Sequence, residues 1–205
     1  MASLPEYDYH HLFIYNCTTD RTVPILRELA AADKRVKVIV NARNFGHIRS
    51  PFHGFLQAPG DAVISLVADL QDPPELIPRF IEKWREGYKI VIGIKSGTRE
   101  SWLMARTRRF YYRLVAKLSS DVELVHNFTG FGLYDRDVIE LMRSTGEQYP
   151  YFRGLISDFG YERAELPYVQ PERHAGRTKN NFFSLYDMAM LGITNHSKVP
   201  LRLAT

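Results

Sequence analysis

Residues 62–75 read Ala-Val-Ile-Ser-Leu-Val-Ala-Asp-Leu-Gln-Asp-Pro-Pro-Glu, and this stretch decides how the chain folds. Its apolar run, rich in β-branched residues, predicts a buried strand that ends at Asp69. The two prolines end the strand and open a helix. Ligands of open α/β sheets bind at the carboxyl ends of strands, so the oxygens of Asp69, Gln71 and Asp72 are placed to hold a hard divalent cation and a phosphorylated ligand. A plainer interpretation also stays open, in which Asp72 only caps the helix.

The rest of the chain alternates short apolar strands with amphipathic helices. Further strands are expected at residues 11–15, 36–40, 89–94 and 164–168. Helices are expected at residues 22–30, 51–57, 75–86, 101–118 and 151–159, with one more from about residue 137 and an apolar one at residues 182–193. This alternation predicts an α/β fold with a mainly parallel sheet and helices on both faces.

Length and composition limit the possible classes of protein. The 205 residues are enough for one domain with a sizeable core. A formal net charge of +4 fits an anionic partner such as a nucleotide, a lipid phosphate or a membrane surface, and gives little support to nucleic acid. The single cysteine, Cys17, excludes an internal disulfide and suits a reducing compartment. We expect no secretory leader at the first residues and no membrane-spanning helix, because no run of about 18 apolar residues occurs.

Five motifs, in order along the chain, resemble those of one known family. They are the turn Thr18-Thr19-Asp20-Arg21-Thr22, the loop Arg43-Asn44-Phe45-Gly46, the stretch from Asp69 to Glu75, the loop with Arg173, Gly176, Thr178 and Lys179, and the segment from Ser197 to Thr205. On these motifs the chain resembles family 2 glycosyltransferases. Within them it is most similar to the polyprenyl-phosphate branch, which includes the dolichyl-phosphate mannose synthases and their bacterial relatives.

The resemblance implies a GT-A fold, which is Rossmann-like, in a single catalytic domain. Residues 8–130 would form the nucleotide-sugar half, residues 131–181 the acceptor half, and residues 182–205 a membrane-proximal helix and tail. The implied reaction moves a sugar from a UDP- or GDP-sugar to a polyprenyl phosphate at the cytoplasmic face of the membrane, with Mg²⁺ or Mn²⁺. The apolar side chains of the last helix, Tyr186 and Met190 among them, would lie either in the core or against the membrane.

The same resemblance assigns roles to individual residues. Donor and metal binding would fall to five side chains: Asn16, Asp20, Arg43, Asp69 and Gln71. Of these, Asp69 and Gln71 would hold the metal, and the other three would surround the nucleoside. The catalytic set would consist of Asp69, Arg173 and Lys179, the last two closing on the phosphates. The acceptor phosphate would be drawn in by one face of a basic helix, namely Arg106, Arg109 and Arg113, although such a face is also typical of a plain solvated helix.

Three positions depart from the family pattern. Val67 stands where the family has the first acid of Asp-x-Asp, so the metal has one carboxylate fewer. Tyr15 replaces the acid that contacts the nucleobase, and Gly130 replaces an acid often assigned to the acceptor. Asp135, beyond that glycine, is expected to be structural.

The ends of the chain are also shorter than the family pattern. The family's first strand would precede residue 1 and its membrane hairpin would follow residue 205, so the fold is expected to be truncated at the N-terminus. An open strand edge would result, and a homo-oligomer is one way to cover it.

Two other functions stay open beside the polyprenyl-phosphate transferase. A family 2 transferase with a saccharide acceptor would need a catalytic base, and Gly130 counts against it. A non-catalytic relative that binds a nucleotide sugar or a partner is favoured by the three departures, whereas the retained Asp69 and Gln71 argue against it. A dinucleotide oxidoreductase is excluded, because no Gly-x-Gly-x-x-Gly follows a strand.

Overall fold

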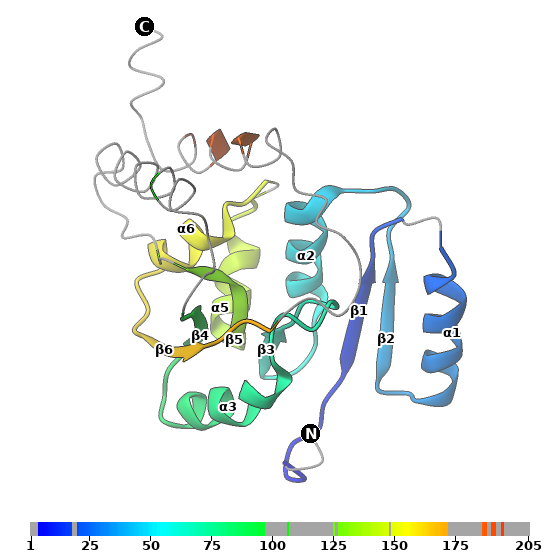
Figure 1. The fold of residues 1–205 in the computed structure, drawn as a ribbon, viewed down its shortest axis with the longest axis horizontal. Helices are drawn as coiled ribbons and strands as arrows, with labels where there is room; N and C mark the ends of the chain where they lie inside the picture. Colours follow the sequence, from blue (N-terminus) through cyan, green and yellow to red (C-terminus); the bar gives the residue numbers. More distant parts are fainter. Residues whose placement is uncertain are drawn as a thin grey trace, which may run out of the picture. The chain divides into compact units, whose positions relative to one another are not determined.

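The computed structural model describes residues 4–17, 20–96, 127–147 and 149–171, together with the single positions 106, 125, 186, 187, 190, 191 and 194. The described residues form an α/β fold of strands and helices in alternation (Figure 1). By their contacts they fall into two compact units, which are described one at a time. Unit 1 comprises residues 1–65, 75–91 and 133–150, and unit 2 comprises residues 66–74, 92–132 and 151–205. The prediction of a single domain stays a prediction.

Unit 1 begins with a parallel pair of strands. Strand β1 (His11–Tyr15) pairs with β2 (Val36–Val40) in a register that sets His11 opposite Val36. Helix α1 (Thr22–Ala32) connects them and packs mainly on β2. Both strands have the bounds that their apolar runs predict, because short β-branched runs between turn residues favour buried strands. In the described part of the chain these two strands form a sheet of their own.

Helix α2 (Gly46–Gln57) begins five residues before the predicted start at Pro51. The buried Ser50 Oγ of this helix accepts a hydrogen bond from Asn41 Nδ2 at 2.9 Å. Pro51 lies inside the helix, one turn after its first residues. Gly54 lets α2 pack closely on β1, because a Cβ there would lie 1.9 Å from Cδ1 of Ile14.

The strand predicted to run from residue 62 to Asp69 is shorter than predicted. Strand β3 spans Ala62–Ser65, and the chain leaves the sheet four residues before Asp69. The reason is local, because residues 66–72 form hydrogen bonds within their own loop instead of continuing a strand ladder. A 3₁₀ turn (Pro74–Leu76) and helix α3 (Ile77–Arg85) follow, and Gly87, with φ +106°, lies just after the C-cap of the helix.

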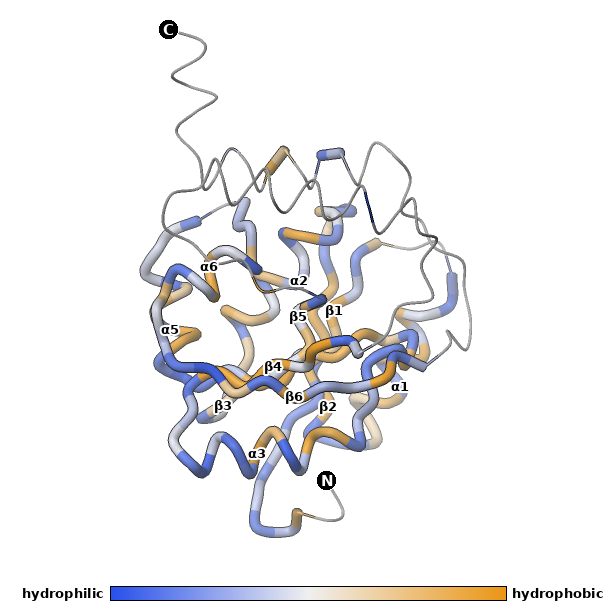
Figure 2. The backbone as a smooth tube through the Cα atoms, turned by 60° about the vertical axis from the view of Figure 1, so that its left-hand side comes forward, coloured by the Kyte–Doolittle hydropathy of each residue, from blue (hydrophilic) through white to orange (hydrophobic). Residues whose placement is uncertain are grey.

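The second sheet has the strand order β3-β5-β4-β6. Strand β4 is Ile90–Lys95, β5 is Phe128–Asp135 and β6 is Arg163–Tyr168, while α5 (Arg136–Ser144) and α6 (Phe152–Asp158) lie between β5 and β6 along the chain. The first three residues of β4 are fully buried, as the hydrophobic colour of this strand in Figure 2 reflects. The predicted α/β class is confirmed. Within the described residues, none of the helices has both the length and the apolar character needed to cross a bilayer.

Asp135 is structural, as predicted, and organises the junction between β5 and α5. Trp84 Nε1 donates to its Oδ2 at 2.6 Å, and Lys89 Nζ lies 3.0 Å from its Oδ1. Its Oδ1 also accepts the amide of Asp137 at 3.0 Å and so caps α5. Burial alone would raise the pKa of this carboxyl, but the three donors outweigh burial and hold the pKa below its ordinary value.

We expect Asp135→Asn to lower the free energy of unfolding by about 1–2 kcal/mol at pH 7, because the charge-assisted bonds to Trp84 and Lys89 are weakened. A carboxyl with a depressed folded pKa contributes stability above its unfolded pKa and loses it as the pH falls through the folded value. The difference between wild type and variant should therefore shrink below about pH 4. Urea unfolding at pH 7 and at lower pH measures both effects.

Asp137→Asn is the matched control, since Asp137 also pairs with Lys89 but its side chain is 63% exposed. Its substitution should cost less than about 0.5 kcal/mol. Equal losses for the two variants would contradict the assignment of Asp135 as the organising residue.

Candidate functional site

The loop that follows β3 carries the predicted metal ligands. Residues 66–72 form a tight turn in which the Leu70 amide bonds the Val67 carbonyl at 3.3 Å. Leu70 adopts φ +59°, a left-handed conformation that bulky side chains disfavour. The Asp69 carboxylate accepts a hydrogen bond from the backbone N–H of Gln71 at 3.2 Å, so the two residues are joined through the backbone. The side chains of Asp69 and Gln71 therefore come from one short piece of chain.

Asp72 closes this loop. Its Oδ2 accepts the Val67 amide at 3.2 Å, and its Oδ1 accepts the Tyr168 hydroxyl at 3.1 Å. The residue is 3% exposed, and burial raises the pKa of its carboxyl although both hydrogen bonds act to lower it. The interpretation of Asp72 as a helix cap is wrong, because α3 has Leu76 at its N-cap and no side-chain cap bond.

The side-chain oxygens of this loop fit a Mg²⁺ or Mn²⁺ ion whose remaining ligands come from a bound diphosphate and water. In the part of the chain that the structure describes, no three His, Cys, Asp or Glu side chains come together to hold a metal. Asp72 accepts hydrogen bonds from two donors, and the other side-chain carboxylate and the side-chain amide of the loop belong to Asp69 and Gln71. Magnesium commonly uses one or two carboxylates plus phosphate oxygens and water, so Asp69 and Gln71 suit a cation delivered with a diphosphate.

Asn16, in unit 1, lies directly after β1 and organises the loop before α2. Its Nδ2 donates to Asn44 Oδ1 at 2.9 Å and to the Gly46 carbonyl at 3.1 Å. Its Oδ1 accepts the Phe45 amide at 2.9 Å and Asn41 Nδ2 at 3.3 Å. These four bonds use the full capacity of an amide side chain. A nucleoside contact at Asn16 stays a prediction, and it would require one of these bonds to break.

Arg43 and Asp20 also lie near strand ends of unit 1. The Arg43 guanidinium stacks on the Phe45 ring at 4.1 Å from the ring centre, and Arg49 approaches the same ring at 5.3 Å. Arg43 also donates to the Asn44 carbonyl at 3.2 Å. Asp20 accepts the Thr22 amide at 3.0 Å at the start of α1. Their predicted roles around a nucleoside stay predictions.

The remaining predicted residues are described in part. Arg106 is exposed and helical. Arg109, Arg113, Arg173 and Lys179 lie outside the described residues, so their roles stay predictions. Two residues that the sequence did not single out are Tyr168, the last residue of a predicted strand, and Asn41, which directly follows the strand predicted at residues 36–40. No signal in the sequence links either one to its partner.

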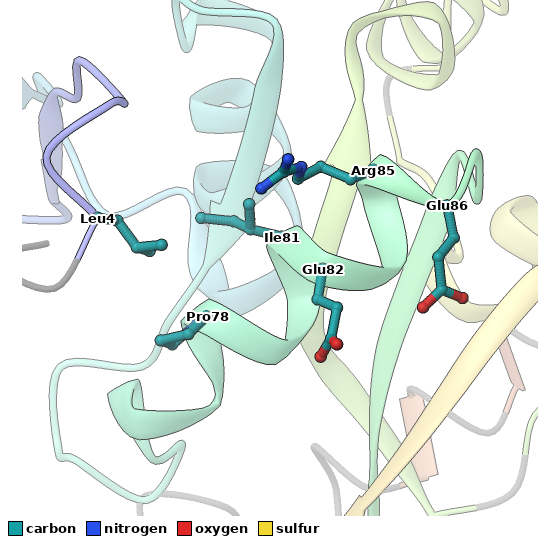
Figure 3. Close-up of a pocket in the computed structure, with 6 residues that line it drawn as sticks. All are labelled: Leu4, Pro78, Ile81, Glu82, Arg85 and Glu86. Carbon is teal, nitrogen blue, oxygen red and sulfur yellow. The ribbon is translucent and has the colours of Figure 1, made fainter.

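A hollow of about 360 Å³ lies elsewhere in unit 1. Figure 3 shows Leu4, Pro78 and Ile81 turned toward one another, whereas Glu82 and Glu86 point away from them. Its lining consists of Leu4, Pro78, Ile81, Glu82, Arg85 and Glu86. It contains none of the predicted site residues.

Comparison with known proteins decides the family. A sequence profile described as "Glycosyl transferase family 2" matches residues 1–142. The chain belongs to glycosyl transferase family 2. This membership confirms the resemblance and agrees with the GT-A fold that the resemblance implied.

Several relatives of this family 2 chain match it over nearly its whole length. It is 39% identical to an uncharacterized glycosyltransferase, YkcC, of Bacillus subtilis, over 97% of this chain and 61% of that protein. It is 36% identical to a prophage bactoprenol glucosyl transferase homolog of Escherichia coli and to a bactoprenol glucosyl transferase of Shigella phage SfX, each over 98% of this chain and 66% of the relative. The chain thus spans less than two thirds of the length of these relatives. The crystal structure of S. aureus TarS 1-349 is similar with a TM-score of 0.42 and 16% identity, over 80% of this chain and 55% of that one.

We expect Asn16→Ala to lower the free energy of unfolding by about 1–3 kcal/mol, because the donors and acceptors of the loop at residues 41–46 lose their shared partner. The loop should also become a preferred site of limited proteolysis. Urea unfolding and mapping of the first cleavage by mass spectrometry measure the two effects.

Asn44→Ala is the control, since it removes one of the four Asn16 bonds together with the bond that Asn44 Oδ1 accepts from the Gly46 amide, and it should still cost less. An unchanged unfolding midpoint for Asn16→Ala would show that the four bonds do not organise the loop.

Proposed function

We propose that this family 2 chain takes part in transferring a sugar from a nucleotide-sugar donor to a polyprenyl phosphate. The observation that carries the proposal is the 36% identity, over 98% of the chain, to proteins named bactoprenol glucosyl transferase. Their name gives glucose as the sugar and bactoprenol as the acceptor lipid. The motifs from Asp69 to Glu75 and from Arg43 to Gly46 lie within the stretch that the family profile matches.

The donor would be held at the loop after β3. Asp69 and Gln71 would bind Mg²⁺ or Mn²⁺, which would neutralise charge on the leaving diphosphate. The backbone N–H of Gln71 donates a hydrogen bond to the Asp69 carboxylate and so orients the carboxylate relative to the loop backbone. This orientation would be present before a ligand binds. Asp20 and Arg43 would lie around the nucleoside, with Asn16 supporting the loop that carries Arg43.

The acceptor needs little help from a base. A phosphate monoester is already anionic near neutral pH, so its oxygen can attack the anomeric carbon without losing a proton to the protein. This suits a chain in which the buried carboxylates of Asp72 and Asp135 are both occupied by hydrogen-bond donors. A saccharide hydroxyl as acceptor would require a base, and neither of these two carboxylates is suited to that role.

Basic and apolar side chains would place the reaction at the membrane. Arg106 is exposed, and together with Arg109 and Arg113 it would attract the acceptor phosphate and anionic lipids. Arg173 and Lys179 would close on the donor phosphates. Tyr186 and Met190 are 53% and 36% exposed, which favours membrane contact over a core position for these two side chains. We therefore propose a peripheral position at the cytoplasmic face.

A second candidate is a relative that binds a nucleotide sugar without transferring the sugar. Val67 favours this candidate, because its apolar side chain is 45% exposed in the loop of residues 66–72, at a position where the family has an acid. A metal site with one carboxylate would bind donor more weakly than a site with two.

We expect the chain to move radiolabelled glucose from UDP- or GDP-glucose into undecaprenyl phosphate vesicles in the presence of Mn²⁺. Asp69→Asn should reduce the rate by on the order of 100-fold, because the carboxylate that holds the cation is lost. Scintillation counting of the organic phase measures the transfer. Asp61→Asn, an exposed acid just before β3, is the control and should leave the rate unchanged.

Each outcome of this assay separates the candidates. Mn²⁺-dependent binding of nucleotide without transfer would favour the non-catalytic relative. Transfer to a soluble saccharide in place of the lipid would support the alternative acceptor. Full activity of Asp69→Asn would contradict the metal assignment.

A further inference from the structure

We propose that Asp72 and Tyr168 are positioning residues that hold the donor loop, residues 66–72, in the conformation that presents Asp69 and Gln71 together. The role rests on the proposed function, because it assumes that these two residues bind a cation with a nucleotide diphosphate. Neither Asp72 nor Tyr168 would touch the cation or the nucleotide. They would act through the backbone of the loop.

The first support is that Asp72 joins the two ends of the loop. Its Oδ2 accepts the Val67 amide at 3.2 Å, so the carboxylate spans the turn that carries Asp69 and Gln71. At 3% exposure this carboxylate is withdrawn from water, and a buried acceptor is costly unless donors reach it. Loss of one of the hydrogen-bond donors to Asp72 should therefore change the conformation of the loop.

The second support is the strained backbone at the centre of the loop. Leu70 has φ +59° and a side chain that is 52% exposed, so its own packing contributes little to holding this conformation. A left-handed conformation is unfavourable for such a residue and persists where the surroundings over-determine it. Hydrogen bonds on both sides of Leu70 supply that constraint, one at Asp69 and one at Asp72.

The third support is that buried residues of unit 2 hold Tyr168, whose hydroxyl donates to Asp72. Tyr168 is 5% exposed, and its ring meets Phe131 edge-on at 5.3 Å. Gly93 makes room for both rings, since a Cβ there would lie 2.6 Å from Phe131 Cδ1 and 3.0 Å from Tyr168 Cε1. The Tyr168 carbonyl also accepts the Ser96 amide at 2.8 Å. The hydroxyl that reaches Asp72 is thus fixed by the core of unit 2.

The test is Tyr168→Phe, which removes the hydroxyl and keeps the ring. Binding of Mn²⁺ in the presence of UDP or GDP is measured by the loss of the free Mn²⁺ signal in electron paramagnetic resonance, at a temperature well below the unfolding midpoint of every variant. We expect Mn²⁺ affinity to fall about tenfold, because one buried charge-assisted hydrogen bond is lost. Tyr161→Phe, another tyrosine of unit 2, should bind like the wild type.

A second variant separates positioning from general stability. Leu70→Asn places at the strained position a residue that adopts the left-handed conformation more readily. In the Tyr168→Phe background it should restore most of the Mn²⁺ affinity, even where the unfolding midpoint stays lowered. Asp72→Asn should weaken Mn²⁺ binding like Tyr168→Phe and respond to Leu70→Asn in the same way.

The outcomes distinguish this proposal from the proposed function. Wild-type affinity in Tyr168→Phe, or no recovery in the double variant, would overturn the positioning role while leaving the metal assignment intact. No Mn²⁺-dependent binding in the wild type, or unchanged binding in Asp69→Asn, would overturn the metal assignment and the positioning role with it.

Discussion

A buried carboxylate must find hydrogen-bond donors, and the way Asp72 does so shapes the candidate site. Its two donors come from different parts of the chain, the Val67 amide within the loop and the Tyr168 hydroxyl at the end of β6. Because the carboxylate is withdrawn from water, these bonds are hard to exchange for solvent. The loop that carries Asp69 and Gln71 is therefore tied to the buried Tyr168 of unit 2.

The loop before α2 is also held by the hydrogen bonds of one polar side chain, here the uncharged amide of Asn16. Asn16 lies at the end of β1, and its four hydrogen bonds hold the chain that leads into the helix. In both places a short polar side chain bonds the backbone of a loop beside a strand end, where an open α/β sheet gathers its ligands. A loop already held by such hydrogen bonds would lose less conformational entropy on binding the proposed nucleotide.

The sequence predicted the family and most of the strands, but it missed β5 (Phe128–Asp135), whose glycines interrupt the apolar run, and it predicted the loops poorly. The strands at residues 11–15 and 36–40 were correct to the residue, because short β-branched runs between turn residues have few other ways to fold. The end of β3 was wrong by four residues, since the apolar run continues through Leu66 and Val67 after the ladder has ended. Tyr168 could not have been predicted as a partner of Asp72, because 96 residues separate them and only the folded sheet brings them together.

The close packing at Gly93 has a consequence for how the family could diverge. The space that a side chain would occupy is filled by the rings of Phe131 and Tyr168, from two other strands. A larger residue at this position could be accommodated only if one of those rings became smaller. Loss of the Tyr168 ring would also remove the hydroxyl from Asp72, so relatives with alanine at this position should carry the smaller side chain at the position of Phe131.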